Sequence, residues 1–268
     1  MRGWRVRIGR VLGVQLWLHA SWFLVFGLVV WLTASEFGDL YPRRSTPVHL
    51  AMALATGALF FGCLTLHELA HATVSKRFGI AVHGITLFMF GGVAEIEGEI
   101  DTPATEFAVA LIGPAISLSL GAMLGLVGLF ASGRNWAVLE GITGTLALVN
   151  LGVAVFNLVP GLPLDGGRLL RASLWRIWGD RRRATRVASI GGLAVAVVLA
   201  GFGIVVALTG DPFGLWYVPM SAFLWFLARA SGRAVPAPAG ALALPDREGE
   251  AARSGSDIDG PIDTGVVT

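Results

Sequence analysis

The chain has 268 residues, of which 54% are hydrophobic and only 14% are charged, and its mean hydropathy is +0.70. These values lie outside the usual range of soluble globular domains and predict a polytopic membrane protein. The formal net charge of +2 is small, so the composition does not indicate a nucleic acid as a partner. The one cysteine, Cys63, excludes a disulfide within the chain.

The first elements expected along the chain are two short strands, at residues 6–8 and 14–18, with a turn at Gly13. A basic start followed by an apolar run is also typical of a secretory signal peptide. We reject that interpretation because the basic region is long and further apolar runs follow the first one.

Six apolar stretches are each near or above the length that crosses about 30 Å of hydrocarbon. They cover residues 19–35, 51–66, 107–134, 141–164, 187–210 and 212–228. The second is expected to continue as a helix towards Phe78. The predicted fold class is therefore an all-α polytopic membrane protein with about six transmembrane helices and a small membrane-associated β-sheet.

Residues 80–99, between the second and third spans, predict a β-hairpin. Apolar and acidic side chains alternate with period two through residues 93–99, and Gly91 and Gly92 mark a turn or a close approach of backbone. A strand edge near an active site can hold an unwound substrate by main-chain hydrogen bonds.

Basic residues are distributed unevenly between the two sides of the membrane. If both termini are cytoplasmic, fifteen Arg and Lys residues among residues 1–233 face the cytoplasm and only Arg43, Arg44 and Arg134 lie outside. We therefore expect a multi-pass protein of the cell membrane with cytoplasmic termini. Residues 1–233 are expected to form the membrane-embedded domain, and residues 234–268, which lack apolar periodicity, a disordered cytoplasmic tail.

The most informative motif is H-E-x-x-H, formed by His67, Glu68 and His71 at the end of the second apolar stretch. Chance would produce it roughly 0.003 times in a chain of this composition. Spacing of four on a helix brings both imidazoles to one face, where they can bind one zinc ion, and Glu68 is then the natural general base. In the alternative, these side chains form hydrogen bonds with one another and bind no metal. Three ionisable groups at membrane depth cost free energy, however, and such groups usually have a function.

A zinc ion held by two histidines needs a third protein ligand, with water at the fourth position. Asp165 is the strongest candidate. Pro160 and Pro163 break the fourth span just before it, so the Asp165 carboxylate emerges from an unwound segment in the leaflet that contains His71. The alternative is an ordinary loop aspartate after a helix end. Cys63 lies one turn before the motif and could also be a ligand, although a lone buried cysteine is usually an apolar filler.

Three motifs together resemble the site-2 protease family of intramembrane zinc metalloproteases. They are the helix of residues 66–72, the pair Gly113-Pro114, and Asn157 followed by P-G-L-P-L-D-G-G-R at residues 160–168. Several motifs together in one chain identify a family more specifically than any one of them alone. The resemblance implies an endopeptidase that hydrolyses a peptide bond in a transmembrane helix of a membrane-tethered regulator, so its partners would be that substrate and the lipid bilayer.

The resemblance also implies roles for individual residues. One zinc ion per chain would be bound by His67, His71 and Asp165, with Glu68 as the base and Asn157, Gly91 and Gly92 as candidate contacts to the substrate or oxyanion. Asn157 could instead satisfy backbone groups freed by Pro160. Ser117 stands where many members carry asparagine, so no direct role is assigned to it. No stretch fits a PDZ or CBS domain, which predicts a bare catalytic core.

A non-catalytic membrane scaffold or a metal transporter is the alternative function. Transporters usually contain repeated halves with broken helices at corresponding positions, and we find no such repeat in the sequence. A scaffold that only binds metal would not need Glu68, which is not required as a ligand. These two observations favour the protease.

Overall fold

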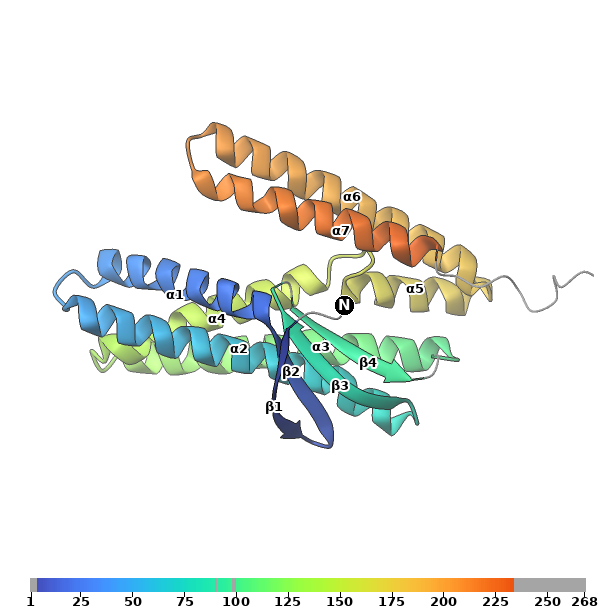
Figure 1. Cartoon of the computed structure of the whole chain (residues 1–268), viewed down its shortest axis with the longest axis horizontal. Coiled ribbons are helices and arrows are strands. Elements are labelled where there is room, and N and C mark those ends of the chain that lie inside the picture. Colours follow the sequence, from blue (N-terminus) through green and yellow to red (C-terminus); the bar gives the residue numbers. More distant parts are fainter. Residues whose placement is uncertain (1–3, 90, 98–99, 234–268) are drawn as a thin grey trace, which may run out of the picture. The chain divides into compact units, whose positions relative to one another are not determined.

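The computed structural model describes residues 4–89, 91–97 and 100–233, apart from the side chains of residues 95–97, 212 and 213. Residues 234–268, expected to be a disordered tail, lie outside the described residues, and that expectation stays a prediction. Helices make up most of the described chain (Figure 1). They are α1 (Ala20–Leu40), α2 (Thr46–Arg77), α3 (Pro103–Ser132), α4 (Ala137–Asn157), α5 (Asp165–Trp178), α6 (Arg181–Leu208) and α7 (Tyr217–Arg233).

Five of the described helices, α1, α2, α3, α4 and α6, are long and apolar enough to cross a membrane. They correspond to five of the six expected spans. The sixth stretch is divided: its first residues form a 3₁₀ turn, η1 (Pro212–Trp216), and α7 follows with 17 residues. The turn packs closely on α6, since a Cβ on Gly214 would lie 2.2 Å from the nitrogen of Ala207. Helix α7 therefore begins only after this turn, at Tyr217. It packs beside α6 (Figure 1).

The fourth span ends at Asn157, and the chain is irregular until α5 begins at Asp165, as the two prolines predicted. This segment is held against α6 by backbone contacts. Leu162 N–H donates to the carbonyl of Ala188 at 2.9 Å, and a Cβ on Gly161 would lie 2.6 Å from the nitrogen of Gly192. Close backbone packing therefore fixes the irregular segment that presents Asp165.

The sheet has four strands in the order β1-β2-β3-β4: β1 (Arg5–Val11), β2 (Val14–His19), β3 (Ala81–Phe88) and β4 (Gly91–Glu97). Each expected hairpin is present as an antiparallel pair, β1 with β2 and β3 with β4. The sequence did not predict that the hairpins join. They do so through parallel pairing of β2 with β3, which makes one sheet from segments separated by α1 and α2.

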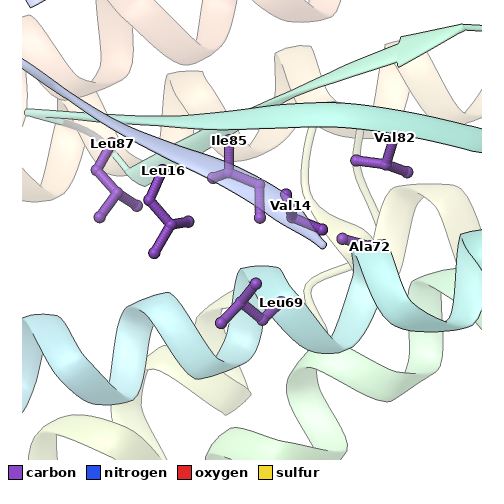
Figure 2. Packing of buried hydrophobic residues seen from close by; sticks show 7 residues of the cluster. All are labelled: Val14, Leu16, Leu69, Ala72, Val82, Ile85 and Leu87. Carbon is purple, nitrogen blue, oxygen red and sulfur yellow. The ribbon is translucent and has the colours of Figure 1, made fainter. Parts of the chain in front are cut away.

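This sheet packs on the part of α2 that carries the histidine motif. Alternate residues of β2, and residues of β3 on both sides of the register shift between Val82 and Gly84, point to one face and meet Leu69 and Ala72 of α2 (Figure 2). The buried cluster consists of Val14, Leu16, Leu69, Ala72, Val82, Ile85 and Leu87. Because successive helical residues are rotated by about 100°, Leu69 and Ala72 lie roughly opposite His67 and His71, and Glu68 lies between the two faces.

Candidate active site

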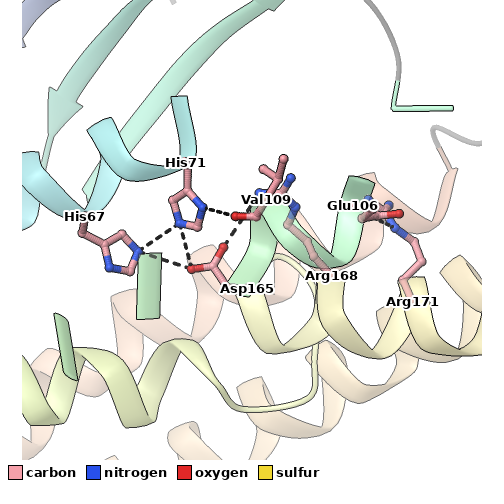
Figure 3. A network of polar contacts seen from close by, with 7 residues as sticks. All are labelled: His67, His71, Glu106, Val109, Asp165, Arg168 and Arg171. Atoms are coloured by element: carbon pink, nitrogen blue, oxygen red, sulfur yellow. Dashed lines mark hydrogen bonds and ion pairs between the residues drawn. The ribbon is translucent and has the colours of Figure 1, made fainter. Parts of the chain in front are cut away.

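Three potential metal ligands from two distant segments converge at the second half of α2 (Figure 3). The Nε2 atoms of His67 and His71 are 3.2 Å apart, and Asp165 Oδ2 lies 3.3 Å from the first and 3.2 Å from the second. Ligand atoms about 2.0–2.1 Å from a tetrahedral zinc ion lie about 3.3 Å from one another. The triangle formed by these atoms therefore fits zinc, with the fourth corner left for water.

The outer nitrogen atoms of both imidazoles contact α3. His71 Nδ1 lies 2.6 Å from the carbonyl oxygen of Val109, and His67 Nδ1 lies 2.9 Å from Ser117 Oγ. A carbonyl oxygen only accepts, so His71 carries a proton on Nδ1. With zinc bound, Nε2 would direct its lone pair to the ion. A histidine that ligates a metal usually has such a partner on its other nitrogen, which is a second observation in favour of zinc.

Helix α3 also approaches the inner nitrogens very closely. A Cβ on Gly113 would lie 2.1 Å from Nε2 of His71 and 2.7 Å from Nε2 of His67. Val109, Gly113 and Ser117 follow one another at intervals of four, so one face of α3 meets the histidine pair. This face supports the site without contributing a ligand.

Glu68 lies beside the three ligand atoms but is not part of the metal cluster. Its carboxylate lies against the backbone of Gly92 at the start of β4. A Cβ on Gly92 would lie 2.6 Å from Glu68 Cγ, so the close backbone approach predicted at this glycine is present. Gly91 has φ of +132°, which glycine adopts without strain, and opens the strand.

Asp165 is the first residue of α5, where its negative charge is favoured by the helix dipole. Burial disfavours its charged form, but hydrogen bonds to His67 and His71 and the charge of Arg168 hold the pKa of the Asp165 carboxyl well below its ordinary value. Gly166 and Gly167 let this end of the helix contact the preceding segment, because a Cβ on Gly166 would lie 2.2 Å from the carbonyl oxygen of Leu158.

A buried ion pair connects α5 to α3 (Figure 3). Arg171 Nε donates to Glu106 Oε1 at 2.7 Å, and Nη2 of the same guanidinium reaches the same oxygen. Glu106 is fully buried, and removing one partner of such a pair leaves an uncompensated charge. The pair therefore positions α5, and with it Asp165, on the same helix that contacts both histidines. Sequence reasoning missed Glu106, although a carboxylate at the edge of an apolar span was a signal.

The remaining candidates lie outside the triangle of ligand atoms. The side-chain amide of Asn157 donates to the carbonyl of Val153 at 3.0 Å, within α4. Cys63 is not part of the metal cluster that the described residues form. Ser117, to which sequence analysis assigned no direct role, is buried and contacts His67, so that expectation missed a polar contact at the site.

Comparison with known proteins agrees with this geometry. The family model described as Peptidase family M50 matches residues 55–143 and 134–199, more than half of the chain. The chain belongs to peptidase family M50. The matched residues include the histidine motif, the α3 face and Asp165, so the site described above lies inside the part that this M50 chain shares with its family.

Individual M50 relatives are similar over most of this chain. A protein of Synechocystis sp. named as a zinc metalloprotease is 38% identical over 85% of this chain and 59% of its own length. The protein named as the zinc metalloprotease Rip3 of Mycobacterium tuberculosis is 36% identical over 84% of this chain and 58% of its own. The M50 chain thus spans about three fifths of the length of these relatives.

A solved structure is similar as well. The site-2 protease from Methanocaldococcus jannaschii aligns with a TM-score of 0.57 and 26% identity, covering 87% of this chain and 98% of the other. The M50 chain thus has the fold of a site-2 protease, as the motifs predicted.

Proposed function

We propose that the chain is a zinc endopeptidase that hydrolyses a peptide bond in or near a transmembrane helix of a membrane-tethered protein. The observation that carries the proposal is the triangle of ligand atoms from His67, His71 and Asp165. Glu68 lies next to this triangle but is not one of the ligands. Three ligands and an adjacent unligated carboxylate are what metal-assisted hydrolysis requires. Membership of peptidase family M50 and the fold of a site-2 protease support the same conclusion.

Each residue would have a separate task. Zinc, when bound, supplies a Lewis acid that polarises the scissile carbonyl and lowers the pKa of water. The Glu68 carboxylate takes the proton of the attacking water and later gives it to the leaving amine. The close approach of the Gly92 backbone restricts the position of that carboxylate. Val109 and Ser117 orient the two imidazoles from α3.

A substrate helix must unwind before it can be cut, because its carbonyl groups are tied up in hydrogen bonds. Strand β4 lies at one end of the strand order and is paired only with β3 among the described strands. Its start touches Glu68, so a substrate segment added along β4 would be held extended beside the ligand triangle. We propose Gly91 and Gly92 as backbone contacts to this segment.

Asn157 is proposed as a further contact to the substrate or oxyanion. Its amide donates to Val153 in this structure, so it would exchange that intrahelical bond for a substrate carbonyl. An Asn157→Asp variant removes the donor while keeping the shape. Unchanged cleavage by that variant would rule out the role.

The central test separates metal binding from chemistry. Glu68→Gln keeps all three ligands, so zinc should be retained while cleavage of a single-span substrate falls by on the order of 10²–10⁴. Asp165→Asn removes a charged ligand and should lower both zinc content and cleavage. Both variants are reconstituted in liposomes, where zinc per chain is measured beside the rate of substrate loss.

Asp180→Asn is the matched control for Asp165→Asn, because Asp180 caps the start of α6 and asparagine caps equally well. Wild-type cleavage by Glu68→Gln would contradict the mechanism. Zinc binding without cleavage in the wild-type chain would favour the alternative of a metal-binding scaffold or transporter.

The proposed location is the cell membrane, with both termini in the cytoplasm. The asymmetry of basic residues supports this orientation, and it places the ligand triangle on the cytoplasmic side. In a Cys63→Ser chain, cysteines placed at residues 45 and 182 should be labelled from the outside and the inside respectively. The reverse pattern would contradict the orientation.

A further inference from the structure

A pocket of about 500 Å³ is lined by residues of β1, β2 and β3, by Gly13 in the turn of the first hairpin and by Lys76 in the last turn of α2. The polar side chains that line it are Arg5, Arg10, Gln15, Lys76 and His83. The described lining contains no carboxylate. The proposed catalysis uses none of these residues, so the pocket is separate from the ligand triangle.

The register of the first hairpin gathers the arginines on one face. Arg5 pairs with His19, and Arg10 pairs with Gln15, so both lie on the face opposite the buried Val14 and Leu16. The register shifts between Arg7 and Gly9. Without this bulge Arg10 would oppose Val14 and point to the apolar face, so the bulge adds a cation to the pocket.

Two of the cations, Lys76 and Arg5, are held in place in advance of any ligand. Lys76 Nζ donates to the carbonyl oxygens of Gly13 at 3.0 Å and Leu12 at 3.4 Å, which fix the ammonium without neutralising it. The guanidinium of Arg5 lies 5.0 Å above the ring of Trp17. Guanidinium and ammonium groups positioned in this way are suited to a phosphate group, and pre-ordering lowers the entropy lost on binding.

The surroundings of the pocket indicate where that phosphate comes from. Helix α2 is long and apolar enough to cross a membrane and ends in two cations, Lys76 and Arg77, which are suited to the headgroup region. Val6, on the other face of the hairpin, is 56% exposed, and Leu12, in the turn of the hairpin, is 70% exposed. An apolar edge beside a basic pocket at the end of a transmembrane helix matches a lipid. Its acyl chains would lie against the apolar edge, and its headgroup would lie in the basic pocket.

We propose that this pocket binds the phosphate group of an anionic phospholipid in the leaflet next to the last turn of α2. The guanidinium of Arg10 and the ammonium of Lys76 contact the phosphate, and the hairpin is thereby anchored to the membrane surface. This site does not depend on the proposed proteolysis, because neither the ligand triangle nor Glu68 takes part in it.

The test measures lipid binding by the full chain with native mass spectrometry in detergent. Phosphatidylglycerol is titrated against phosphatidylcholine with the same acyl chains, at constant ionic strength. We expect preferential binding of phosphatidylglycerol, reduced about five-fold by Arg10→Gln and further by Arg10→Glu. Arg10 is exposed, so both variants should keep the wild-type thermal midpoint.

Arg7 provides the matched control. It is exposed and lies on the same face of the same strand, opposite Trp17, but does not line the pocket. Arg7→Gln should change phosphatidylglycerol binding less than two-fold, and an equal loss for Arg7→Gln and Arg10→Gln would show diffuse surface charge and overturn the site. Inorganic phosphate forms a second arm: binding of phosphate that depends on Arg10, with no preference between the two lipids, would overturn the lipid as the occupant.

Discussion

The two halves of α2 pack in different ways. In the first half, Met52 and Ala53 join Val30 and Phe37 of α1 in an apolar cluster. In the second half, the buried side chains of His67 and His71 contact a hydroxyl, a backbone carbonyl and a carboxylate. Apolar contacts depend mainly on volume and shape, whereas each polar contact depends on one particular partner. The first half of α2 should therefore tolerate changes of side chain that keep its volume. In the second half, the loss of one contacting atom should disturb the site.

The largest effect should come from adding one methyl group on α3 opposite the second half. Gly113→Ala would place a Cβ 2.1 Å from Nε2 of His71, where a metal ligand must stand. We expect zinc content to fall well below one per chain and cleavage to fall by on the order of 10²-fold, the effect of displacing catalytic groups by about 1 Å. Elemental analysis and the cleavage rate measure this.

Gly125→Ala is the control for that prediction. It is the same change on the same helix, but its Cβ would meet only Ala147 at 3.7 Å, an ordinary contact. Zinc content and activity should remain at the wild-type level. A loss in both variants would mean that α3 tolerates no added methyl group, and the comparison between the halves of α2 would lose its support.

A smaller effect is expected from the hydroxyl that contacts His67. Ser117→Ala removes the partner of Nδ1, and loss of such a partner typically weakens metal binding by about 10–100-fold. Competition with a zinc chelator measures the affinity. Ser119→Ala serves as the control, because Ser119 is exposed and its hydroxyl donates to the carbonyl of Ala115 within its own helix. Equal affinities for the two variants would remove Ser117 from the site.

The smallest effect on the site is expected from the first half of α2. Met52→Ala removes a side chain that is 2% exposed and should lower stability by about 2–5 kcal/mol, seen as a lower thermal midpoint in detergent. Zinc per folded chain should stay unchanged. Leu54→Ala, at a side chain that is 45% exposed, should lower the midpoint much less. Loss of zinc from folded Met52→Ala protein would show that the halves are coupled.

Local features of this molecule could be predicted from sequence because their signals are local. The period-two alternation in residues 93–99 predicted the strand observed as β4, and Pro160 and Pro163 predicted the break before Asp165. The helical spacing of His67 and His71 predicted that their imidazoles share a face. Each of these inferences used only neighbouring residues and the geometry of one element.

The contacts made by α3 could not be predicted in the same way. Glu106 in an apolar region required a cationic partner, but several arginines follow Asp165 and only the packing of α5 selects Arg171. The carbonyl of Val109 carries no sequence signal, since every residue has one. The pairing of β2 with β3 likewise depends on how α1 and α2 return the chain to the same place. Partner choice over long distances is a property of the assembled fold.

The parallel pairing of β2 with β3 also constrains the order of assembly. β2 ends at His19 and β3 begins at Ala81, with α1 and α2 between them. Two strands can pair only on the same side of a bilayer, so the chain must cross it an even number of times between them. During synthesis the edge of β2 that pairs with β3 therefore stays unpaired until both helices have inserted. We expect the contact of Gly92 with Glu68 to form only after that step, so under the proposed mechanism a newly made chain would gain activity only once its first pair of crossings is complete.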